Sequence, residues 1–293
     1  MKIVITGSLG HISRPLAQEL IQKGHSVTII SSNTAKHKDI EVMGATAAIG
    51  SVEDPSFLAG TFTGADAAYC MTPPNFAEPD QLHYYERIAE HYAAAIHKSG
   101  IKKIVYLSSY GAHLPAGTGF ITGSYRAEKI LNAVEGIHLT HIRPAYFYYN
   151  LLGFIPMIKT AGFIGAVYGG TDRLPMVSPF DIAASVAEEI TRTDSAGKVR
   201  YVVSDERSCD EIATLLGNAI GIPGLQWLVL PEQEVMASLI ANGVPENAAR
   251  NLVELGAATH TGLLREEMDV YKPAPGKLKL EDFVSEFSAA YQQ

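Results

Sequence analysis

Two glycines near the beginning of the chain have the spacing of a phosphate-binding loop. The segment 6–13 reads TGSLGHIS, with glycine at positions 7 and 10. Glycine lets the backbone turn tightly and approach a phosphate, and the helix that follows offers unpaired N–H groups and the positive end of its dipole. We therefore predict that a dinucleotide binds here. The residues expected at its pyrophosphate are Gly7, Leu9, Gly10, His11 and Ile12.

This spacing differs from that of ordinary dehydrogenases. Their fingerprint is G-x-G-x-x-G, whereas this chain has G-x-x-G-x-x-S, with Ser13 in the third place. The third glycine normally allows close packing of the helix on the strand, and serine is small enough to keep that role. A plain strand–turn–helix without a ligand is the alternative interpretation.

The residues after the second expected strand favour NADP over NAD. An NAD site usually places an acidic residue here to hold the ribose 2′-hydroxyl. This chain has SSNTAKHK at 31–38, and the nearest acids follow at Asp39 and Glu41. Hydroxyls, an amide and lysines suit a 2′-phosphate, although a solvated loop that caps a short helix is the alternative. The residues expected to hold the 2′-phosphate are Ser31, Asn33 and Lys36.

These loops require a frame of strands and helices, which the sequence supplies in regular alternation. Strands are expected at 2–6, 26–31, 45–49, 65–71, 102–109 and 139–144, and helices at 11–23, 79–99 and 124–135. Apolar β-rich runs that alternate with amphipathic helices are typical of α/β proteins with a doubly wound parallel sheet. Ligands of such sheets bind at the carboxyl ends of the strands.

After Asn150 the alternation loosens. Helices are expected near 180–193, 209–220, 232–242, 246–257 and 280–291, and strands near 199–203 and 225–231. We therefore predict a dinucleotide-binding core at 1–150 and a smaller, mostly helical lobe at 151–293 that packs over the strand ends. No linker separates the two parts, so elements of the second part are free to return to the core.

The composition excludes several classes of protein. Of the 293 residues, 47% are hydrophobic and 18% charged, which is typical of a globular chain. The net charge is −8, without runs of like charge, and this argues against binding of nucleic acid. Every apolar stretch is shorter than the roughly 18–20 residues that span a bilayer. Two cysteines fit a reducing compartment, so a cytoplasmic protein without a membrane segment is expected.

The histidines and cysteines do not have metal-binding spacings. The chain has ten histidines and two cysteines, without an H-x-x-x-H or C-x-x-C arrangement. We therefore expect no metal site.

Several groups of residues together resemble the NmrA-like branch of the atypical short-chain dehydrogenases. These groups are Gly7 with Gly10, Thr72-Pro73-Pro74, Ser108-Ser109, Arg143-Pro144 and Asn150-Leu151. The similarity covers roughly 1–190, including SPFDIA at 178–183. It implies an NADP-binding Rossmann core with a small C-terminal lobe over the nicotinamide end. The further cofactor contacts that it implies are Thr72, Pro73, Pro74, Ser108, Pro144 and Tyr146.

In the wider superfamily, a tyrosine and a lysine four residues apart carry the proton chemistry. Tyr125 and Lys129 have this spacing. The resemblance implies that Lys129 lowers the pKa of Tyr125, which then donates a proton to a substrate carbonyl. Ser108 or Ser109 would hold the carbonyl oxygen. A surface helix with a chance Tyr–Lys pair is the alternative.

Aromatic side chains crowd the segment after the sixth expected strand. Residues 146–149 read YFYY, and another tyrosine and a histidine follow the fifth strand. These residues suit an apolar pocket for a flat substrate, and core packing under the second lobe is the alternative. The residues expected to line the pocket are Tyr110, His113, Phe147 and Tyr148.

Together these features favour an NADP(H)-dependent oxidoreductase that transfers hydride between nicotinamide and a small carbonyl, quinone or aromatic acceptor. The family that this chain resembles also includes members that bind the dinucleotide without turnover. A non-catalytic redox sensor that acts through a protein partner is therefore the alternative. A nucleotide-sugar epimerase shares the fold but usually needs a longer substrate domain.

NADPH is expected to bind more tightly than NADH, because the loop after the second strand lacks an acidic residue. Charge-assisted hydrogen bonds to a phosphate are worth about 1.5–3 kcal/mol each, so a single good contact gives roughly tenfold or more in affinity. Calorimetric titration with both cofactors measures the ratio. Equal or tighter binding of NADH would contradict this prediction.

Overall fold

The core of the molecule is a seven-stranded sheet whose strands all run parallel. The computed structural model describes residues 1–75, 77–193 and 198–293, and its strand order is β10-β6-β5-β4-β1-β2-β3. The strands are β1 (Lys2–Ile5), β2 (Ser26–Ser31), β3 (Thr46–Ile49), β4 (Ala67–Met71), β5 (Lys103–Leu107), β6 (His138–Pro144) and β10 (Val199–Val202). The order reverses between β1 and β4, which opens a crevice at the carboxyl edge. The expected doubly wound parallel sheet is confirmed.

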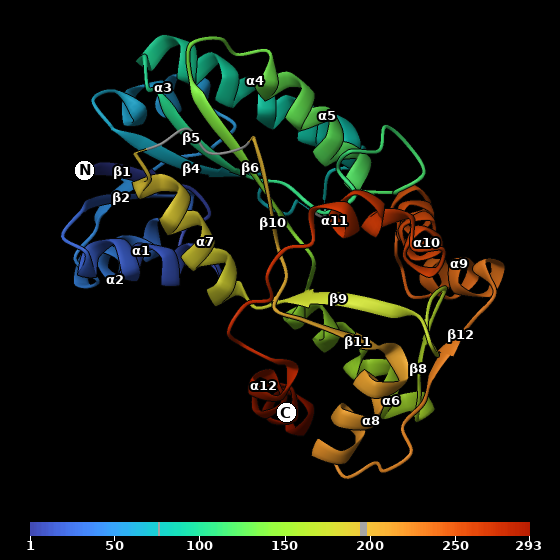
Figure 1. Cartoon of the computed structure of the whole chain (residues 1–293). Coiled ribbons are helices and arrows are strands. Elements are labelled where there is room, and N and C mark those ends of the chain that lie inside the picture. Colours follow the sequence, from blue (N-terminus) through green and yellow to red (C-terminus); the bar gives the residue numbers. More distant parts are fainter. Residues whose placement is uncertain (76, 194–197) are drawn as a thin grey trace.

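Helices cover both faces of this sheet (Figure 1). The first face carries α1 (Ser13–Gln22), α2 (His37–Val42) and α7 (Pro179–Thr191), and the second carries α3 (Pro55–Phe62), α4 (Gln81–Ser99) and α5 (Ile121–Asn132). In β1, Ile3 and Ile5 enter the core under α1, whereas Val4 enters the core under α4. Alternate residues point to opposite faces, so a strand covered on both sides is apolar throughout. None of the helices within the described ranges is both long and apolar enough to cross a membrane.

The second lobe has a core of its own. Here β9 (Arg173–Val177) pairs with β7 (Tyr146–Phe147) and β11 (Asp205–Ser208), and β8 (Ile164–Ala166) pairs with β12 (Trp227–Val229). The helical elements around them are α6 (Ile155–Ala161), α8 (Cys209–Ala219), α12 (Leu280–Gln292) and the 3₁₀ segment Tyr148–Phe154. Trp227 and Phe287 are fully buried at its centre. The lobe is therefore a mixture of short strands and helices.

The chain passes between the two lobes more than once. After the second lobe has begun, α7 returns to cover the sheet and β10 extends the sheet beside β6. A division of the chain at residue 150 therefore does not separate the two lobes, because α7 and β10, which follow it in sequence, belong to the core.

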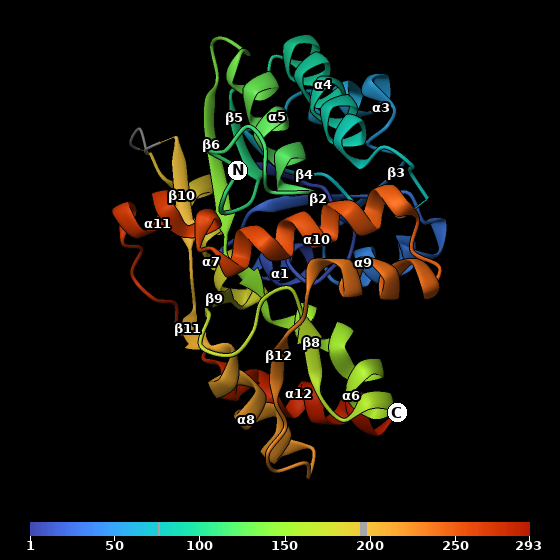
Figure 2. The ribbon, with the colours of Figure 1, turned by 90° about the vertical axis from the view of Figure 1, so that its right-hand side faces the viewer.

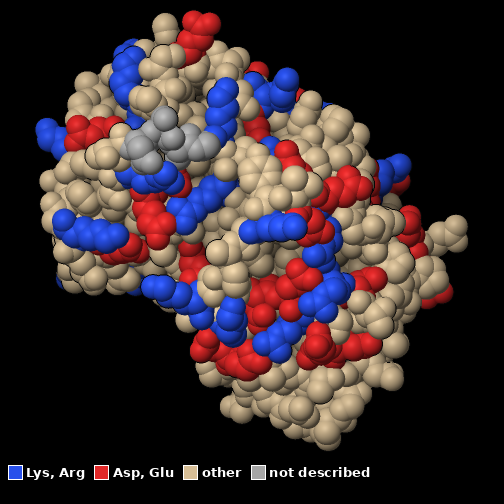
Figure 3. Space-filling model, in the orientation of Figure 1, with Lys and Arg blue, Asp and Glu red and all other residues tan. Residues whose placement is uncertain are grey.

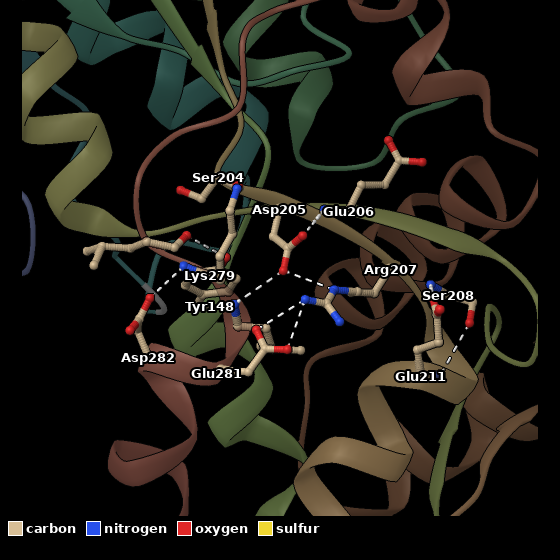
Figure 4. A network of polar contacts seen from close by, with 12 residues as sticks. Tyr148, Ser204, Asp205, Glu206, Arg207, Ser208, Glu211, Lys279, Glu281 and Asp282 are labelled. Carbon is tan, nitrogen blue, oxygen red and sulfur yellow. Dashed lines mark hydrogen bonds and ion pairs between the residues drawn. The ribbon is translucent and has the colours of Figure 1, made fainter.

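A polar network links α12 to the segment that follows β10 (Figure 4). Arg207 donates to Asp205 at 3.0 Å and reaches both carboxylate oxygens of Glu281 on α12 at 3.0 and 3.1 Å. Lys279 Nζ donates to the carbonyl of Ser204 at 2.6 Å. Acidic and basic side chains are interleaved across this face of the molecule (Figure 3). The network fixes the last helix against the strand that follows the core.

A helical hairpin closes one side of the carboxyl edge. It consists of α9 (Glu232–Ala241) and α10 (Glu246–His260) and is followed by the 3₁₀ segment Leu263–Arg265 and by α11 (Glu266–Tyr271). Figure 2 shows α10 running between the sheet and the second lobe. Asn247 donates to the carbonyl of Pro79 at 2.9 Å, and His260 bonds Asp172 at 2.7 Å. Hydrogen bonds therefore hold the start of α10 against Pro79 and its end against Asp172.

Gly119→Ala is expected to destabilise the protein more than Gly117→Ala does. Both glycines have positive φ, +55° and +79°, so alanine strains the backbone at each position by about 1–3 kcal/mol. At Gly119 a Cβ would also lie 2.0 Å from the carbonyl oxygen of Asn251 on α10, whereas at Gly117 the nearest atom is 3.9 Å away. The clash should add roughly 1–3 kcal/mol. Urea unfolding of both variants measures the difference, and equal losses would show that α10 does not press on this loop.

Candidate cofactor and substrate cleft

A continuous cleft of about 1110 Å³ runs along the carboxyl edge of the sheet. Its walls are the loops after β1, β2, β3, β4, β5 and β6, together with one side of α10. Parallel strands end at a common edge, so loops far apart in sequence share one space. The expected residues that line it are Gly7, Gly10, His11, Ile12, Ser31, Thr72, Pro73, Pro74, Ser108, Tyr110, Pro144, Tyr146 and Phe147.

The glycine loop has the geometry of an anion site. Gly7 has φ of +88°, and a Cβ there would lie 2.6 Å from Ser13 Oγ. That hydroxyl donates to the carbonyl of Thr6 at 2.7 Å, so the serine in place of the third glycine is bonded to the end of β1. Among the described residues no side chain caps the start of α1, and its first turn has no acid. The N–H groups and positive dipole end of α1 are therefore available to an anion.

The loop after β2 contributes fewer side chains to the cleft than expected. Ser31 lines it and accepts a hydrogen bond from the N–H of Asn33 at 3.2 Å. Asn33 Oδ1 accepts from a backbone N–H two residues later at 2.9 Å, which caps the 3₁₀ segment Thr34–Lys36. Lys36 Nζ lies 3.6 Å from Asp39. Asn33 and Lys36 are not part of the cleft wall, so their contact with a 2′-phosphate stays a prediction.

The loop after β3 also reaches this end of the cleft, and sequence reasoning missed it. Residues 50–53 line the wall. Glu53 lies 3.7 Å from Arg87 of α4, which also donates to Glu78 at 2.7 Å. The loop carries no recognisable motif, and only its place beside β2 in the sheet brings it to the cleft. This end of the cleft therefore holds a carboxylate whose charge is partly balanced by a guanidinium.

The other end of the cleft is an aromatic chamber. Tyr110, Tyr146 and Tyr168 line it with Phe154, and Leu255 of α10 closes one side. Tyr168 donates to the hydroxyl of Tyr146 at 3.4 Å. Burial raises the pKa of Tyr146 to about 12, so its phenol keeps its proton at neutral pH. The chamber therefore combines flat apolar surfaces with phenolic hydrogen-bond donors, and its walls include second-lobe residues that the sequence did not indicate.

Some expected site residues lie outside the cleft wall. Tyr148 points into the core of the second lobe, where its hydroxyl donates to the carbonyl of Leu278 at 3.1 Å. His113 lies 3.8 Å from Glu267, away from the chamber. Leu9 lines a smaller neighbouring cavity of about 590 Å³. Within the described ranges, no group of three or more His, Cys, Asp or Glu residues is placed to hold a metal ion.

Helix α5 presents a different face to the cleft from the one expected. Ser124 lines the cleft, and Glu128 is buried and accepts a hydrogen bond from Ser108. Tyr125 and Lys129 lie one position further on, which turns them about 100° around the helix axis. Lys129 is exposed, and neither residue lines the cleft. The expected role of Tyr125 as proton donor does not fit this position.

A buried ion pair stands behind the cleft wall. Arg143, at the end of β6, donates from Nε to Glu128 Oε1 at 2.9 Å and from Nη2 to Oε2 at 2.7 Å. Its Nη1 donates to Tyr201 of β10 at 2.9 Å and to Glu267 of α11. Burial disfavours the charge on Arg143, but Glu128 outweighs burial and raises the pKa of the guanidinium. One carboxylate therefore connects Ser108 in the cleft with α11.

The fold and the cleft together define the class of protein. A doubly wound parallel sheet with a glycine loop between its first strand and first helix is a dinucleotide-binding Rossmann fold. The sequence profile of the NmrA-like family matches residues 1–273, and the chain belongs to this family.

Several proteins that are similar to this chain in sequence or in structure are named as reductases, and other similar structures are those of nucleotide-sugar epimerases. The chain is 29% identical over 226 residues to the (4-alkanoyl-5-oxo-2,5-dihydrofuran-3-yl)methyl phosphate reductase of Streptomyces griseus, covering 75% of this chain and 74% of the relative. It is 22% identical over 277 residues to the NAD(P)H azoreductase of Xenophilus azovorans, covering 94% and 93%. The NADPH-dependent quinone oxidoreductase of Escherichia coli, complexed with NADPH, superposes with a TM-score of 0.76 at 23% identity, covering 97% of this chain and 99% of that one. The last comparison shows a shared fold.

Gly10→Val is expected to abolish dinucleotide binding while the protein still folds. A Cβ at this position would meet only the carbonyl oxygen of Gly7, at 3.0 Å, so the branched side chain extends into the cleft. It would occupy the space where a pyrophosphate meets the start of α1. Calorimetry with NADPH measures the loss of binding, and a thermal melt shows whether the variant is folded. Gly60→Val, on an open surface of α3, is the control. Normal NADPH binding by Gly10→Val would place the phosphate loop elsewhere.

Proposed function

We propose that this protein is an NADPH-dependent reductase that transfers hydride to a small, flat acceptor. The observation that carries the proposal is the continuity of the cleft. The open start of α1 and the aromatic chamber are two ends of one space. A dinucleotide whose pyrophosphate sits at the glycine loop has room to extend its nicotinamide toward Ser108, Pro144 and the chamber.

NADPH is the cofactor that the features around the cleft support best. The loop after β2 offers hydroxyl groups and no acidic side chain to the cleft. The Escherichia coli neighbour was solved with NADPH, and the Xenophilus azovorans relative is named for NAD(P)H. The carboxylate of Glu53 would repel the 2′-phosphate of NADPH, and the neighbouring guanidinium of Arg87 offsets part of that repulsion. The comparison of NADPH with NADH therefore tests this part of the proposal directly.

The chain itself supplies binding, orientation and exclusion of water, and bound NADPH supplies the hydride. The glycine loop and the start of α1 hold the pyrophosphate. Tyr110, which is buried, and the partly buried Tyr146 and Tyr168 line the chamber. Because Tyr168 donates its proton to Tyr146, the phenols of Tyr110 and Tyr146 would offer the hydrogen bonds to oxygens or nitrogens of the substrate. A flat aromatic or quinone acceptor suits this chamber because ring faces pack against rings and its heteroatoms meet donors.

The proposal is tested by NADPH oxidation with a panel of quinones, azo dyes and aldehydes. Quinones and dyes are expected to be reduced faster than aldehydes, because a reduced quinone takes its proton from water. Gly10→Val serves as the negative control. Binding of NADPH without turnover of any acceptor would overturn the reductase proposal. It would instead favour a redox sensor, and the search would move to a protein partner.

Tyr125→Phe and Tyr146→Phe make the same chemical change outside and inside the cleft. Tyr125→Phe is expected to leave quinone turnover within about twofold of wild type, because Tyr125 does not line the cleft. Tyr146→Phe removes a phenolic donor in the chamber and should lower kcat/KM by roughly two- to tenfold, the usual effect of one hydrogen bond. A large loss in Tyr125→Phe with normal NADPH affinity would restore its role as proton donor.

A further inference from the structure

Ser108 is a polar side chain of the cleft whose proton is donated to a neighbouring carboxylate. Its hydroxyl is nearly buried and donates to Glu128 Oε1 at 2.5 Å. Ser108 lines the cleft, and no described residue donates a hydrogen bond to its hydroxyl oxygen. A hydroxyl has one proton and two lone pairs, so Ser108 can offer only lone pairs to a molecule in the cleft.

Glu128 cannot return a proton to this pair. Its Oε1 accepts from Arg143 Nε at 2.9 Å as well as from Ser108, and its Oε2 accepts from Arg143 Nη2 at 2.7 Å. A guanidinium keeps its proton at all ordinary pH values, so both oxygens face permanent donors. Only 5% of the Glu128 side chain is exposed, which keeps water from competing. The direction of the Ser108–Glu128 hydrogen bond is therefore set by the ion pair.

Ser108 was expected both to contact the cofactor and to hold a substrate carbonyl, and this direction of the hydrogen bond argues against the second role. A substrate carbonyl placed against Ser108 would bring lone pair against lone pair. A buried polar group that stays unpaired costs binding free energy, so the cleft disfavours a ligand that places a hydrogen-bond acceptor against Ser108. A ligand that offers an N–H or O–H there is favoured instead.

The position of Ser108 along the sheet indicates which donor it meets. It follows β5, which is separated from β1 and its glycine loop by β4. Neighbouring strands lie about 4.8 Å apart, so Ser108 is roughly 10 Å along the edge from the pyrophosphate site. The ribose loop after β2 lies in the opposite direction. The nicotinamide end of a dinucleotide therefore reaches Ser108, and its carboxamide carries N–H donors.

We propose that Ser108, oriented by Glu128, accepts a hydrogen bond from the carboxamide N–H₂ of the nicotinamide, with Glu128 as a positioning residue. The inference rests on the proposed function, because it requires a nicotinamide cofactor in this cleft. It makes the serine after β5 a determinant of cofactor binding and not the holder of the substrate carbonyl.

The test compares NADP⁺ with its 3-acetylpyridine analogue, in which a methyl group replaces the carboxamide N–H₂ and the carbonyl is kept. Wild type is expected to bind NADP⁺ roughly three- to tenfold more tightly, as one hydrogen bond would give. Ser108→Ala should weaken NADP⁺ and leave the analogue unchanged, so that the ratio falls to about one. Dissociation constants are measured by calorimetry, without turnover.

The control ligand is 2′,5′-ADP, which lacks the nicotinamide. Its affinity should be the same for wild type and Ser108→Ala. Failure of 2′,5′-ADP and NADP⁺ to bind wild type would overturn the proposed function itself. Normal binding of 2′,5′-ADP with an unchanged NADP⁺-to-analogue ratio in Ser108→Ala would overturn only the role of Ser108. Equal weakening of both nicotinamide ligands would also overturn it, since Ser108 would then donate to the carbonyl that they share.

Glu128→Gln tests the positioning role. A glutamine amide can donate to Ser108, which frees the serine proton to point into the cleft. The preference for NADP⁺ over the analogue should then fall, although the serine is still present. Circular dichroism and the affinity for 2′,5′-ADP show whether the variant is folded. A folded variant with the wild-type ratio would show that Glu128 does not orient Ser108.

Discussion

The arrangement of the cleft depends on the buried ion pair between Arg143 and Glu128. It joins the end of β6 to the middle of α5, and its remaining contacts reach Tyr201 on β10 and Glu267 on α11. Removing one partner of such a pair leaves an uncompensated buried charge, which costs about 3–5 kcal/mol. The Glu128 carboxylate of this pair also accepts the hydrogen bond that Ser108 donates. The position of α11 and the hydrogen-bond direction of Ser108 are thus coupled through the Arg143–Glu128 pair.

The second constraint is the common carboxyl edge of the parallel strands. Because β1 to β6 and β10 all point the same way, their loops meet along one line and need a cover on the open side. Helix α10 supplies part of that cover, tied to Pro79 of the core and to Asp172 of the second lobe. The aromatic chamber exists only because second-lobe residues such as Phe154 and Tyr168 are brought over the strand ends.

Most of the core could be predicted because its elements carry strong local patterns. The expected strand 26–31 coincides with β2, and the expected helix 79–99 differs from α4 only at its start. The short helices α2, α3, α6 and α11 and the strands β7, β8, β9 and β11 were not predicted. Each is too short to show a clear period, and the strands of the second lobe are stabilised by partners far away in sequence. The Tyr125–Lys129 spacing fixes the separation of two residues on a helix but not the direction in which that face points, and neither residue lines the cleft, so their catalytic role stays a prediction.

By itself the sequence determined the parallel α/β core and the place of the glycine loop between its first strand and first helix, because strand and helix periodicity and the positions of Gly7 and Gly10 are local properties. It also excluded the disordered class through its apolar content. The tertiary structure alone decided which face of α5 looks into the cleft, that Glu53 reaches the cleft wall, and that Tyr148 turns into the second lobe. It also decided that the proton of Ser108 points to Glu128. The physical reason is that burial and the direction of a hydrogen bond depend on neighbours far away in sequence. Arg143 and Glu267 are 124 positions apart, and Tyr148 and Leu278 are 130 positions apart.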